Sequence, residues 1–411
     1  MTKKYQTISF IQPSRNNLKY LKWSYESIRK NLGYTHEICM ADDFSDDGTW
    51  EWMQEISEKD INVKIHRNEG PTRLGHTILY DTLINDYATN DVVMIYHADM
   101  YACPRLDEEV LRHIEPGVVV SGTRIEPPLH PDGPEKILKD FGIEPEEFDE
   151  HGLIEFLNTE VMNQYGTGIT TEGIFAPWAI LKSDWDFIGG HDPIFAPQSK
   201  EDSDIFNRFH LAGFKFKQTW GGFVYHMTCR GSRFKDGAMR NPAGQVFMNG
   251  RESDEWLIQN KKSTREFIRK WGHFVKHDEM MKPIVPPKYD IGMVAYNCTK
   301  ELLSELEPWC SKIYLDLKDS DCIFYYKNDE QPKTSTDLDE KIKLYGNSKI
   351  SELHDICIEF DCNKLNATNF QHIVNLSEIL QDSGEIGEME LDIFKLYISK
   401  LDTHEKELIQ L

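Results

Sequence analysis

The sequence predicts an α/β fold in which a mostly parallel sheet is covered by helices, followed by a second, smaller α/β domain. Strand-like and helix-like segments alternate over the first hundred residues, which is the pattern of parallel strands joined by crossover helices. A proline-rich stretch over 282–288 cannot continue a helix and is predicted to be a linker. Beyond it, strand-like and helix-like segments alternate again.

The predicted elements follow one another in short units. Four apolar segments of the N-terminal region are predicted as strands, at 7–11, 37–41, 63–65 and 92–96. Apolar residues recur at helical spacing between them, as at Leu18, Leu21, Tyr25, Ile28 and Leu32. Further strands are predicted at 117–121, 290–296, 312–317 and 354–360, and a helix over 204–211. The strand at 92–96 is apolar throughout, which favours the centre of the sheet.

Polar residues collect where these predicted strands end. They occupy 12–16 after the first strand, Asp42 and Asp43 after the second, and 97–99 after the central strand. In an open α/β sheet the loops at the carboxyl ends converge where the strand order reverses, and they form the ligand crevice there. The clustering therefore predicts a binding site at this edge.

Composition excludes several classes of protein. The chain of 411 residues carries a formal net charge of -23, which argues against a nucleic-acid binder that neutralises phosphates. From Tyr289 onward there are 25 acidic residues against 12 lysines and no arginine, so a site for a phosphorylated ligand is expected upstream. No apolar run is long enough for a transmembrane segment or a signal peptide, and a cytoplasmic protein is expected. The eight cysteines have no zinc-site spacing and are expected to be free thiols.

Asp99 is the strongest candidate for a metal ligand on its position alone. It follows the central strand, and His97 lies two residues before it, on the same side if the strand alternation continues. Carboxylate oxygens bind the divalent cations that neutralise a leaving diphosphate. The alternative is that Asp99 only caps a turn, and an isolated His-Ala-Asp tripeptide favours this alternative.

The N-terminal region as a whole resembles family 2 glycosyltransferases. Residues 8–16, Ile-Ser-Phe-Ile-Gln-Pro-Ser-Arg-Asn, are similar to the opening strand and nucleotide-binding loop of that family. Residues 40–49 are similar to its DD-x-S-x-DGT segment, and the order and spacing agree. The resemblance covers roughly the first 280 residues and implies a GT-A fold, a Rossmann-like domain that transfers sugars from nucleotide diphosphates.

This resemblance assigns roles to particular residues. The nucleotide-binding set it implies is Pro13, Ser14, Asn16, Asp42, Asp43, Arg73, His97 and Ala98. Within it, Asp42 or Asp43 recognises the base and Arg73 lies near the donor phosphates. His97-Ala98-Asp99 occupies the position of the family's DxD motif, with a histidine in place of the first aspartate. Imidazole can bind manganese or donate to a ribose, so the expected cofactor is Mn²⁺ or Mg²⁺.

A second block of the sequence extends the resemblance. Residues 188–192 and 200–206 are similar to the GG-x-D and ED-x-D segments of the family, in which the carboxylate matching Asp202 is the general base of inverting transfer. An acidic residue at a helix start is also favoured by the exposed amides of the first turn. Both roles are compatible, and the order of the motifs favours a catalytic one.

His226 is predicted to complete the metal site, because it follows a predicted strand and Asp99 needs a further ligand. An isolated histidine is as often a core or surface residue. The segment 228–237, with Arg230, Arg233 and Lys235 among glycines, has the composition of a mobile basic lid over a diphosphate, or of an ordinary solvated loop.

The prediction for the whole chain is a GT-A domain over 1–281, a linker over 282–288 and an acidic α/β domain over 289–411 that could mediate oligomerisation. The expected activity is inverting, metal-dependent transfer of a sugar from a nucleotide-diphosphate donor, with a UDP-sugar favoured, to a glycan or other hydroxyl acceptor. One alternative is a nucleotidyltransferase, although the loop over 12–17 lacks the glycines of a phosphate loop. The other is an inactive carbohydrate-binding or assembly protein.

Overall fold

The computed structural model describes residues 5–32, 35–228, 230, 237–248, 252–316, 318, 320–345 and 353–411. Its contacts divide the chain into two compact units. The first holds the chain up to Gln259, together with His277–Pro283 and Leu411, and the second holds Asn260–Lys276 and Ile284–Gln410. The boundary between the two units lies within helix α9 (Asp254–Trp271). The domain boundaries at 281 and 289 stay a prediction.

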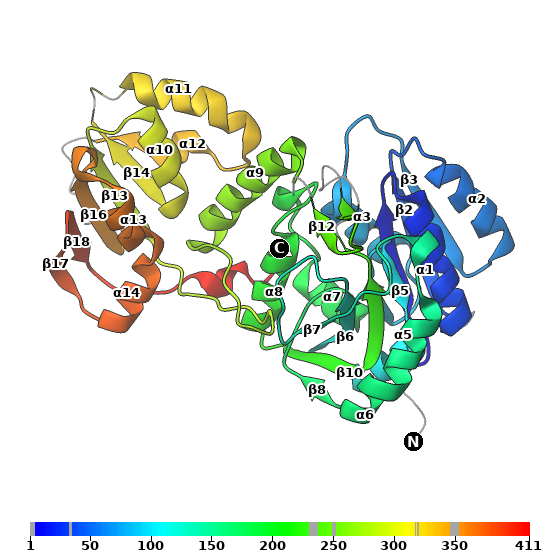
Figure 1. Ribbon diagram of the computed structural model, residues 1–411. Coiled ribbons are helices and arrows are strands. Elements are labelled where there is room, and N and C mark those ends of the chain that lie inside the picture. Colours follow the sequence, from blue (N-terminus) through cyan, green and yellow to red (C-terminus); the bar gives the residue numbers. More distant parts are fainter. Residues whose placement is uncertain are drawn as a thin grey trace. The chain divides into compact units, whose positions relative to one another are not determined.

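A sheet of ten strands forms the centre of the first unit (Figure 1). Its main path runs β3-β2-β1-β4-β9-β6-β10-β5, with β7 beside β6 and β8 beside β10. The bounds are β1 Ser9–Ser14, β2 Glu37–Asp43, β3 Val63–Asn68, β4 Val92–Ile95, β5 Met100–Ala102, β6 Val118–Glu126, β7 Lys136–Leu138, β8 Thr170–Thr171, β9 Trp178–Leu181 and β10 Lys215–His226. The four N-terminal strands predicted from the sequence are confirmed.

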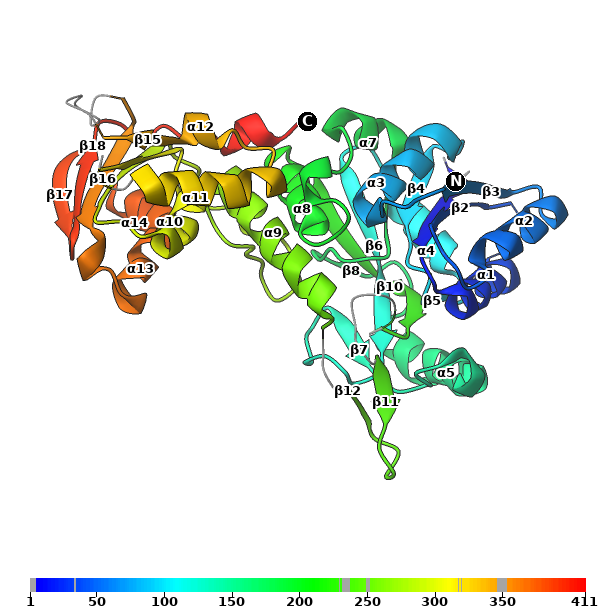
Figure 2. The same cartoon turned by 90° about the horizontal axis from the view of Figure 1, so that it is seen from above.

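Helices cover both faces of this sheet, as its apolar strands require. In Figure 2, α1 and α2 lie on one side of β2 and β3, and α3 and α7 lie on the other. The helices of the first unit are α1 Leu18–Asn31, α2 Thr49–Lys59, α3 Gly75–Thr82, α4 Leu106–His113, α5 Glu150–Phe156, α6 Met162–Gln164, α7 Lys182–Ile188 and α8 Glu201–Leu211. A hairpin of β11 (Ala238–Arg240) and β12 (Val246–Met248) forms a separate two-stranded sheet.

The strand order reverses at β1. This strand pairs in parallel with β2 on one side and with β4 on the other, so the connection to β4 turns back across the sheet. The carboxyl ends of β1, β2 and β4 therefore meet at one edge, where α/β proteins bind ligands. The first two predicted polar clusters include the last residues of β1 and β2, and the third follows β4.

The second unit is also α/β, as predicted for the acidic tail. Its sheet has the order β15-β14-β13-β16-β18-β17, and only β18 and β17 run antiparallel to their neighbours. The strands are β13 Ile291–Tyr296, β14 Lys312–Leu315, β15 Ile342–Leu344, β16 Ile356–Asp361, β17 Gly387–Leu391 and β18 Phe394–Ile398. The helices after α9 are α10 Lys300–Leu306, α11 Ser320–Glu330, α12 Leu338–Lys341, α13 Ala367–Val374 and α14 Leu376–Ser383.

A group of buried charges lies inside the second unit. Glu307 is fully buried, and its carboxylate contacts Arg265, Arg269 and Lys341 at 3.2 Å or less. The hydroxyl of Tyr326 donates a hydrogen bond to the same carboxylate. Glu307 is therefore the common partner of three cations from α9 and α12, and the two arginines also pair with Glu330.

Two predictions made from composition can be compared with the described residues. The seven cysteines among them are free, and six of the seven are buried. Cys229 lies outside the described residues. Among the described helices, none combines the length and the hydropathy required to cross a bilayer.

Candidate active site

Residues at the carboxyl ends of β1 and β2 are tied to each other. Ser14, the last residue of β1, pairs in register with Asp42 of β2. In the loop after β1, the side-chain oxygen of Asn16 accepts a hydrogen bond from the backbone amide of Asp46. The backbone amide of Asn16 donates to the hydroxyl of Ser45. The hydroxyl of Ser14 is buried and forms no hydrogen bond with a described residue. The predicted nucleotide loop and the aspartate segment thus form one surface.

The two neighbouring aspartates have different surroundings. Asp43 accepts hydrogen bonds from the amides of Leu74 and Gly75, at 3.0 and 2.8 Å, and from the side chain of Asn68. Its carboxylate therefore holds the start of α3. Asp42 accepts from the amide of Ser45, while its Oδ2 atom lies 3.5 Å from Arg67 without a hydrogen bond. Asp42 is thus the member of the pair that retains a free acceptor atom.

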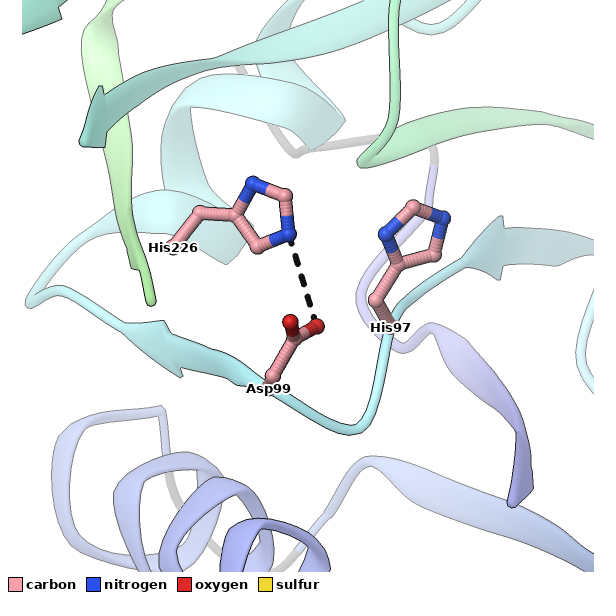
Figure 3. A group of neighbouring side chains, drawn as sticks. All are labelled: His97, Asp99 and His226. Atoms are coloured by element: carbon pink, nitrogen blue, oxygen red, sulfur yellow. Dashed lines mark ion pairs between the residues drawn. The ribbon is translucent and has the colours of Figure 1, made fainter. Parts of the chain in front are cut away.

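The structure brings His97, Asp99 and His226 together (Figure 3). One ligand atom from each lies within 4.8 Å of the others. Strand pairing explains this proximity: His226 ends β10 and pairs in register with Met100 of β5, the residue after Asp99. The amide of Met227 also donates to the carbonyl of Asp99. Predicted residues more than a hundred positions apart therefore share one site.

The charges of this group depend on one another. Burial alone would raise the pKa of Asp99, but the adjacent His226 lowers it to about 2. Burial lowers the pKa of His226, yet the carboxylates of Asp99 and Glu126 outweigh it and raise the value to about 9. Burial lowers the pKa of His97 to about 3, so this ring is neutral at pH 7 and can donate a nitrogen lone pair.

Glu126 is a residue of the site that the sequence did not indicate. It ends β6, which runs parallel to β10, and its Oε1 atom lies 2.8 Å from Nδ1 of His226. Because a carboxylate only accepts hydrogen bonds, Nδ1 carries the proton and Nε2 faces Asp99 at 3.4 Å. Arg124 and Lys136 in turn hold Glu126 by ion pairs. Only the register of β6 against β10 could have revealed this contact.

Asp202 lies in the first turn of α8, outside the group of three. It is half-buried, whereas its neighbour Glu201 is buried. Burial raises the pKa of the nearby Tyr80, and the charges of Asp202, Glu201 and Asp99 raise it further. The catalytic role of Asp202 therefore stays a prediction.

Comparison of the sequence with protein families gives one match. The model for glycosyl transferase family 2 matches residues 9–168, which contain the crevice strands, the aspartate pair and Asp99. Residues 9–168, in the N-terminal part of the chain, thus match glycosyltransferase family 2. The predicted α/β class, with a GT-A type domain followed by a smaller α/β domain, is confirmed by this match and by the two sheets. A search of curated proteins found no match.

Several solved structures are similar to this chain. They include GalNAc-T7 with UDP, GalNAc and Mn²⁺, at 13% identity and a TM-score of 0.41, covering 54% of this chain and 43% of that one. The mannosyltransferase PcManGT from Pyrobaculum calidifontis with GDP-Man and Mn²⁺ has 17% identity and a TM-score of 0.37, covering 54% and 56%. TarS from S. aureus has 15% identity and a TM-score of 0.38, covering 55% and 37%. The chain spans 37% to 56% of these proteins.

The donor set of the glycosyltransferase domain fits a transition metal better than magnesium. Two imidazoles and one carboxylate converge, and the side chains of Asp99 and His226 are only 12% and 10% exposed. Manganese accepts nitrogen and oxygen ligands, whereas magnesium strongly prefers oxygen. Three protein ligands also leave coordination positions for ligand oxygens.

The basic residues predicted to lie near the donor phosphates have different positions. Arg73, in the loop between β3 and α3, donates to Gln198 at 2.8 Å and lies 3.6 Å from both Asp43 and Glu255. Arg230 contacts the carboxylate of Glu144 and the carbonyl of Ile143. Arg233 and Lys235 lie outside the described residues. The lid therefore stays a prediction.

Proposed function

We propose that this protein is a metal-dependent glycosyltransferase that moves a sugar from a nucleotide-diphosphate donor to the hydroxyl of a glycan or other acceptor. The observation that carries the proposal is the convergence of His97, Asp99 and His226 beside the strand reversal of a family 2 domain. A cation at these side chains would neutralise the leaving diphosphate. The donor set favours Mn²⁺ over Mg²⁺, and UDP is the favoured nucleotide.

The surrounding residues have separate tasks in this proposal. The free oxygen of Asp42 accepts a hydrogen bond from the base, beside the loop of Pro13, Ser14 and Asn16. Ala98 is buried between the two ligands of its own loop, so its backbone fixes their spacing. Arg73 is placed to attract the diphosphate once its contacts with Asp43 and Glu255 rearrange.

Asp202 is the proposed general base. Its carboxylate removes the proton from the acceptor hydroxyl while the oxygen attacks the anomeric carbon from the side opposite the diphosphate, which inverts the configuration. Burial raises the pKa of Asp202 above its ordinary value, and this makes the carboxylate a stronger base. The partial exposure of Asp202 supports access by an acceptor.

Nucleotide binding is tested first, by thermal unfolding with UDP or GDP and with Mn²⁺, Mg²⁺ or no metal. We expect UDP with Mn²⁺ to raise the melting temperature most, because a ligand selective for the folded state stabilises it. Asp99→Asn should abolish the metal-dependent part of this shift. Equal shifts without metal, or with Asp99→Asn, would contradict the proposed metal site.

Chemistry is tested by release of UDP from UDP-sugars with water as acceptor. Asp202→Asn should reduce release by about 10²- to 10⁴-fold while metal-dependent UDP binding persists. Asp186→Asn, an exposed aspartate of α7, serves as the control and should retain the wild-type rate. Binding without any turnover would favour an inactive carbohydrate-binding protein, and release of pyrophosphate from a nucleoside triphosphate would favour a nucleotidyltransferase.

A further inference from the structure

A pocket of the first unit lies between strand β7 and the segment that runs from α5 into α6. A π-helical turn, Leu157–Val161, joins the two helices and contributes to the lining. The volume of the pocket is about 280 Å³. This value is near the lower end of the range of about 300–1,000 Å³ for small-molecule sites. The pocket therefore suits one small ring rather than a whole nucleotide sugar.

The pocket lies at the edge of the sheet that also carries the proposed metal site. Strand β7 pairs in parallel with the last three residues of β6, from Arg124 opposite Lys136 to Glu126 opposite Leu138 (Figure 1). Strand β6 runs parallel to β4, because both pair with β9 in antiparallel fashion. The carboxyl ends of β4 and β6 are therefore at the same edge.

Lys136 connects the pocket to the metal site through printed side-chain contacts. Its side chain lines the pocket, while its ammonium group lies 3.7 Å from Glu126 and 3.6 Å from Glu135. Glu126 forms the hydrogen bond with His226, and His226 faces Asp99. Three successive contacts thus join the two sites, and one extended substrate could occupy both.

The floor of the pocket is apolar and partly aromatic. Ile137 and Phe156 are half-buried and pack against a buried cluster that includes Val161. Tyr165 stacks on Trp220, with ring centroids 4.4 Å apart and an angle of 22° between the planes. The indole therefore holds the phenol ring that lines the pocket. Aromatic surface of this kind packs against the C–H groups of a ligand ring.

The rim of the pocket is polar. Asp132, Glu160 and Gln164 are exposed. Neither the amide of Gln164 nor the hydroxyl of Tyr165 has a hydrogen bond with another described residue. Glu160 lies 4.0 Å from Lys139. Amide, hydroxyl and carboxylate groups can donate to or accept from the hydroxyls of a sugar. An apolar floor with such a rim is the combination that a sugar ring requires.

The charges of the pocket disfavour a phosphorylated ligand. Among the described residues that line it, Lys136 is the one cation, and its ammonium group already pairs with Glu126 and Glu135. Asp132 and Glu160 add negative charge at the rim. Phosphate groups bind where unpaired cations or several donors converge. The expected occupant is therefore neutral, unlike the nucleotide proposed for the ends of β1 and β2.

We propose that this pocket binds a neutral sugar ring of the acceptor, which makes the acceptor a glycan. The inference rests on the proposed function, because an acceptor belongs to the transfer reaction. The ring packs on Phe156 and Tyr165, and its hydroxyls form hydrogen bonds with Gln164 and the acidic rim. The π-helical turn beside the pocket supports this role, since such turns occur frequently at functional sites.

The first test is saturation-transfer NMR with the methyl glycosides of glucose, galactose, mannose and N-acetylglucosamine, without donor or metal. We expect at least one of them to bind to the wild type. Gln164→Ala and Tyr165→Ala should each weaken this binding by about 3- to 10-fold, the loss expected for one hydrogen bond or one aromatic contact. Asn163→Ala is the matched control, because Asn163 is an exposed residue of α6 that does not line the pocket. It should bind as the wild type does.

The second test asks whether the bound sugar belongs to an acceptor. A trisaccharide of the sugar that binds should accelerate UDP release from a UDP-sugar with Mn²⁺, and the KM for the trisaccharide should rise in Gln164→Ala but not in Asn163→Ala. Circular dichroism checks that each variant is folded. If Tyr165→Ala does not fold without its contact with Trp220, Tyr165→Phe takes its place, since it retains the ring and removes only the hydroxyl.

The outcomes separate the inference from the proposed function. The inference is refuted if none of the glycosides binds, if the Gln164 and Tyr165 variants bind them as Asn163→Ala does, or if the trisaccharide does not accelerate UDP release. A wild type that releases UDP with water but binds no glycoside would refute the inference alone. A wild type that binds a glycoside but releases no UDP from any UDP-sugar would refute the proposed function, and the acceptor role of the pocket with it.

Discussion

Glu126 and His226 form a hydrogen bond of 2.8 Å between neighbouring strand ends. Since Nδ1 donates to Glu126, Nε2 lies toward Asp99, and it would have to release its proton to bind a metal ion. Outer carboxylates of this kind fix the tautomer and the ring orientation of histidine ligands to metals. Glu126 therefore acts on the proposed metal site through His226.

Glu126→Gln should weaken Mn²⁺ binding in the presence of UDP by about 10- to 100-fold. The amide can accept the same hydrogen bond but lacks the charge that orients and polarises the ring. Titration calorimetry measures the affinity. Glu135→Gln is the matched control, because Glu135 contacts Arg124 and Lys136 as Glu126 does. Equal affinities for the two variants would disprove this role of Glu126.

Asp42→Ala should mainly weaken UDP binding, whereas Asp43→Ala should mainly lower the stability of the fold. The first removes a buried carboxylate with a free oxygen, and UDP affinity should fall by about 10- to 100-fold with little change in stability. The second leaves the amides of Leu74 and Gly75 unpaired, which should lower the free energy of unfolding by about 1–3 kcal/mol. Urea unfolding and UDP titration of both variants test the contrast. A stability loss in Asp42→Ala as large as in Asp43→Ala would contradict it.

Glu307→Gln should destabilise the second unit by about 3–5 kcal/mol, because it leaves three buried cations without their common partner. Urea unfolding followed by hydrogen exchange in β13 and β16 would report the loss. Glu305→Gln changes an exposed residue two positions away and should be nearly neutral. A Glu307→Gln protein as stable as this control would show that the other acidic residues balance the buried cations without Glu307.

The stability of the second unit should fall between pH 6.5 and pH 4. Burial lowers the pKa of His273 from 6.5 to about 4, so in this window the unfolded chain binds a proton that the folded chain does not. Stability is therefore complete above pH 6.5 and decreases as the pH falls, by up to about 3 kcal/mol from this residue. His273→Gln should flatten the dependence, measured by urea unfolding at several pH values. His372→Gln, a half-buried histidine of α13, should not.

The fold of the first half could be predicted because its signals are local. Strand periodicity and polar strand ends lie within a few residues of each other, as at 92–99. Antiparallel β9 was not predicted, although it inserts between β4 and β6 in the sheet, because that placement depends on long-range pairing. The boundary between the two units inside α9 was not predicted either, since the helix continues across this boundary and no residue there ends the helix.

The residues of the candidate site also divide into those that could be predicted from the sequence and those that could not. The resemblance to family 2 named Asp99, His226 and Asp202, and the structure brings the first two together. The contact of Glu126 with His226 was not predicted, because it needs the register of β6 with β10. No spacing in the sequence reports this relationship.

The carboxylate of Asp43 is already saturated by the chain itself, which affects how any mutational survey of this protein should be interpreted. Every Asp43 variant disturbs the entrance of α3, and α3 also carries Tyr80 and Asp81. A loss of activity in such a variant would therefore not distinguish a lost nucleotide contact at position 43 from a displaced start of α3.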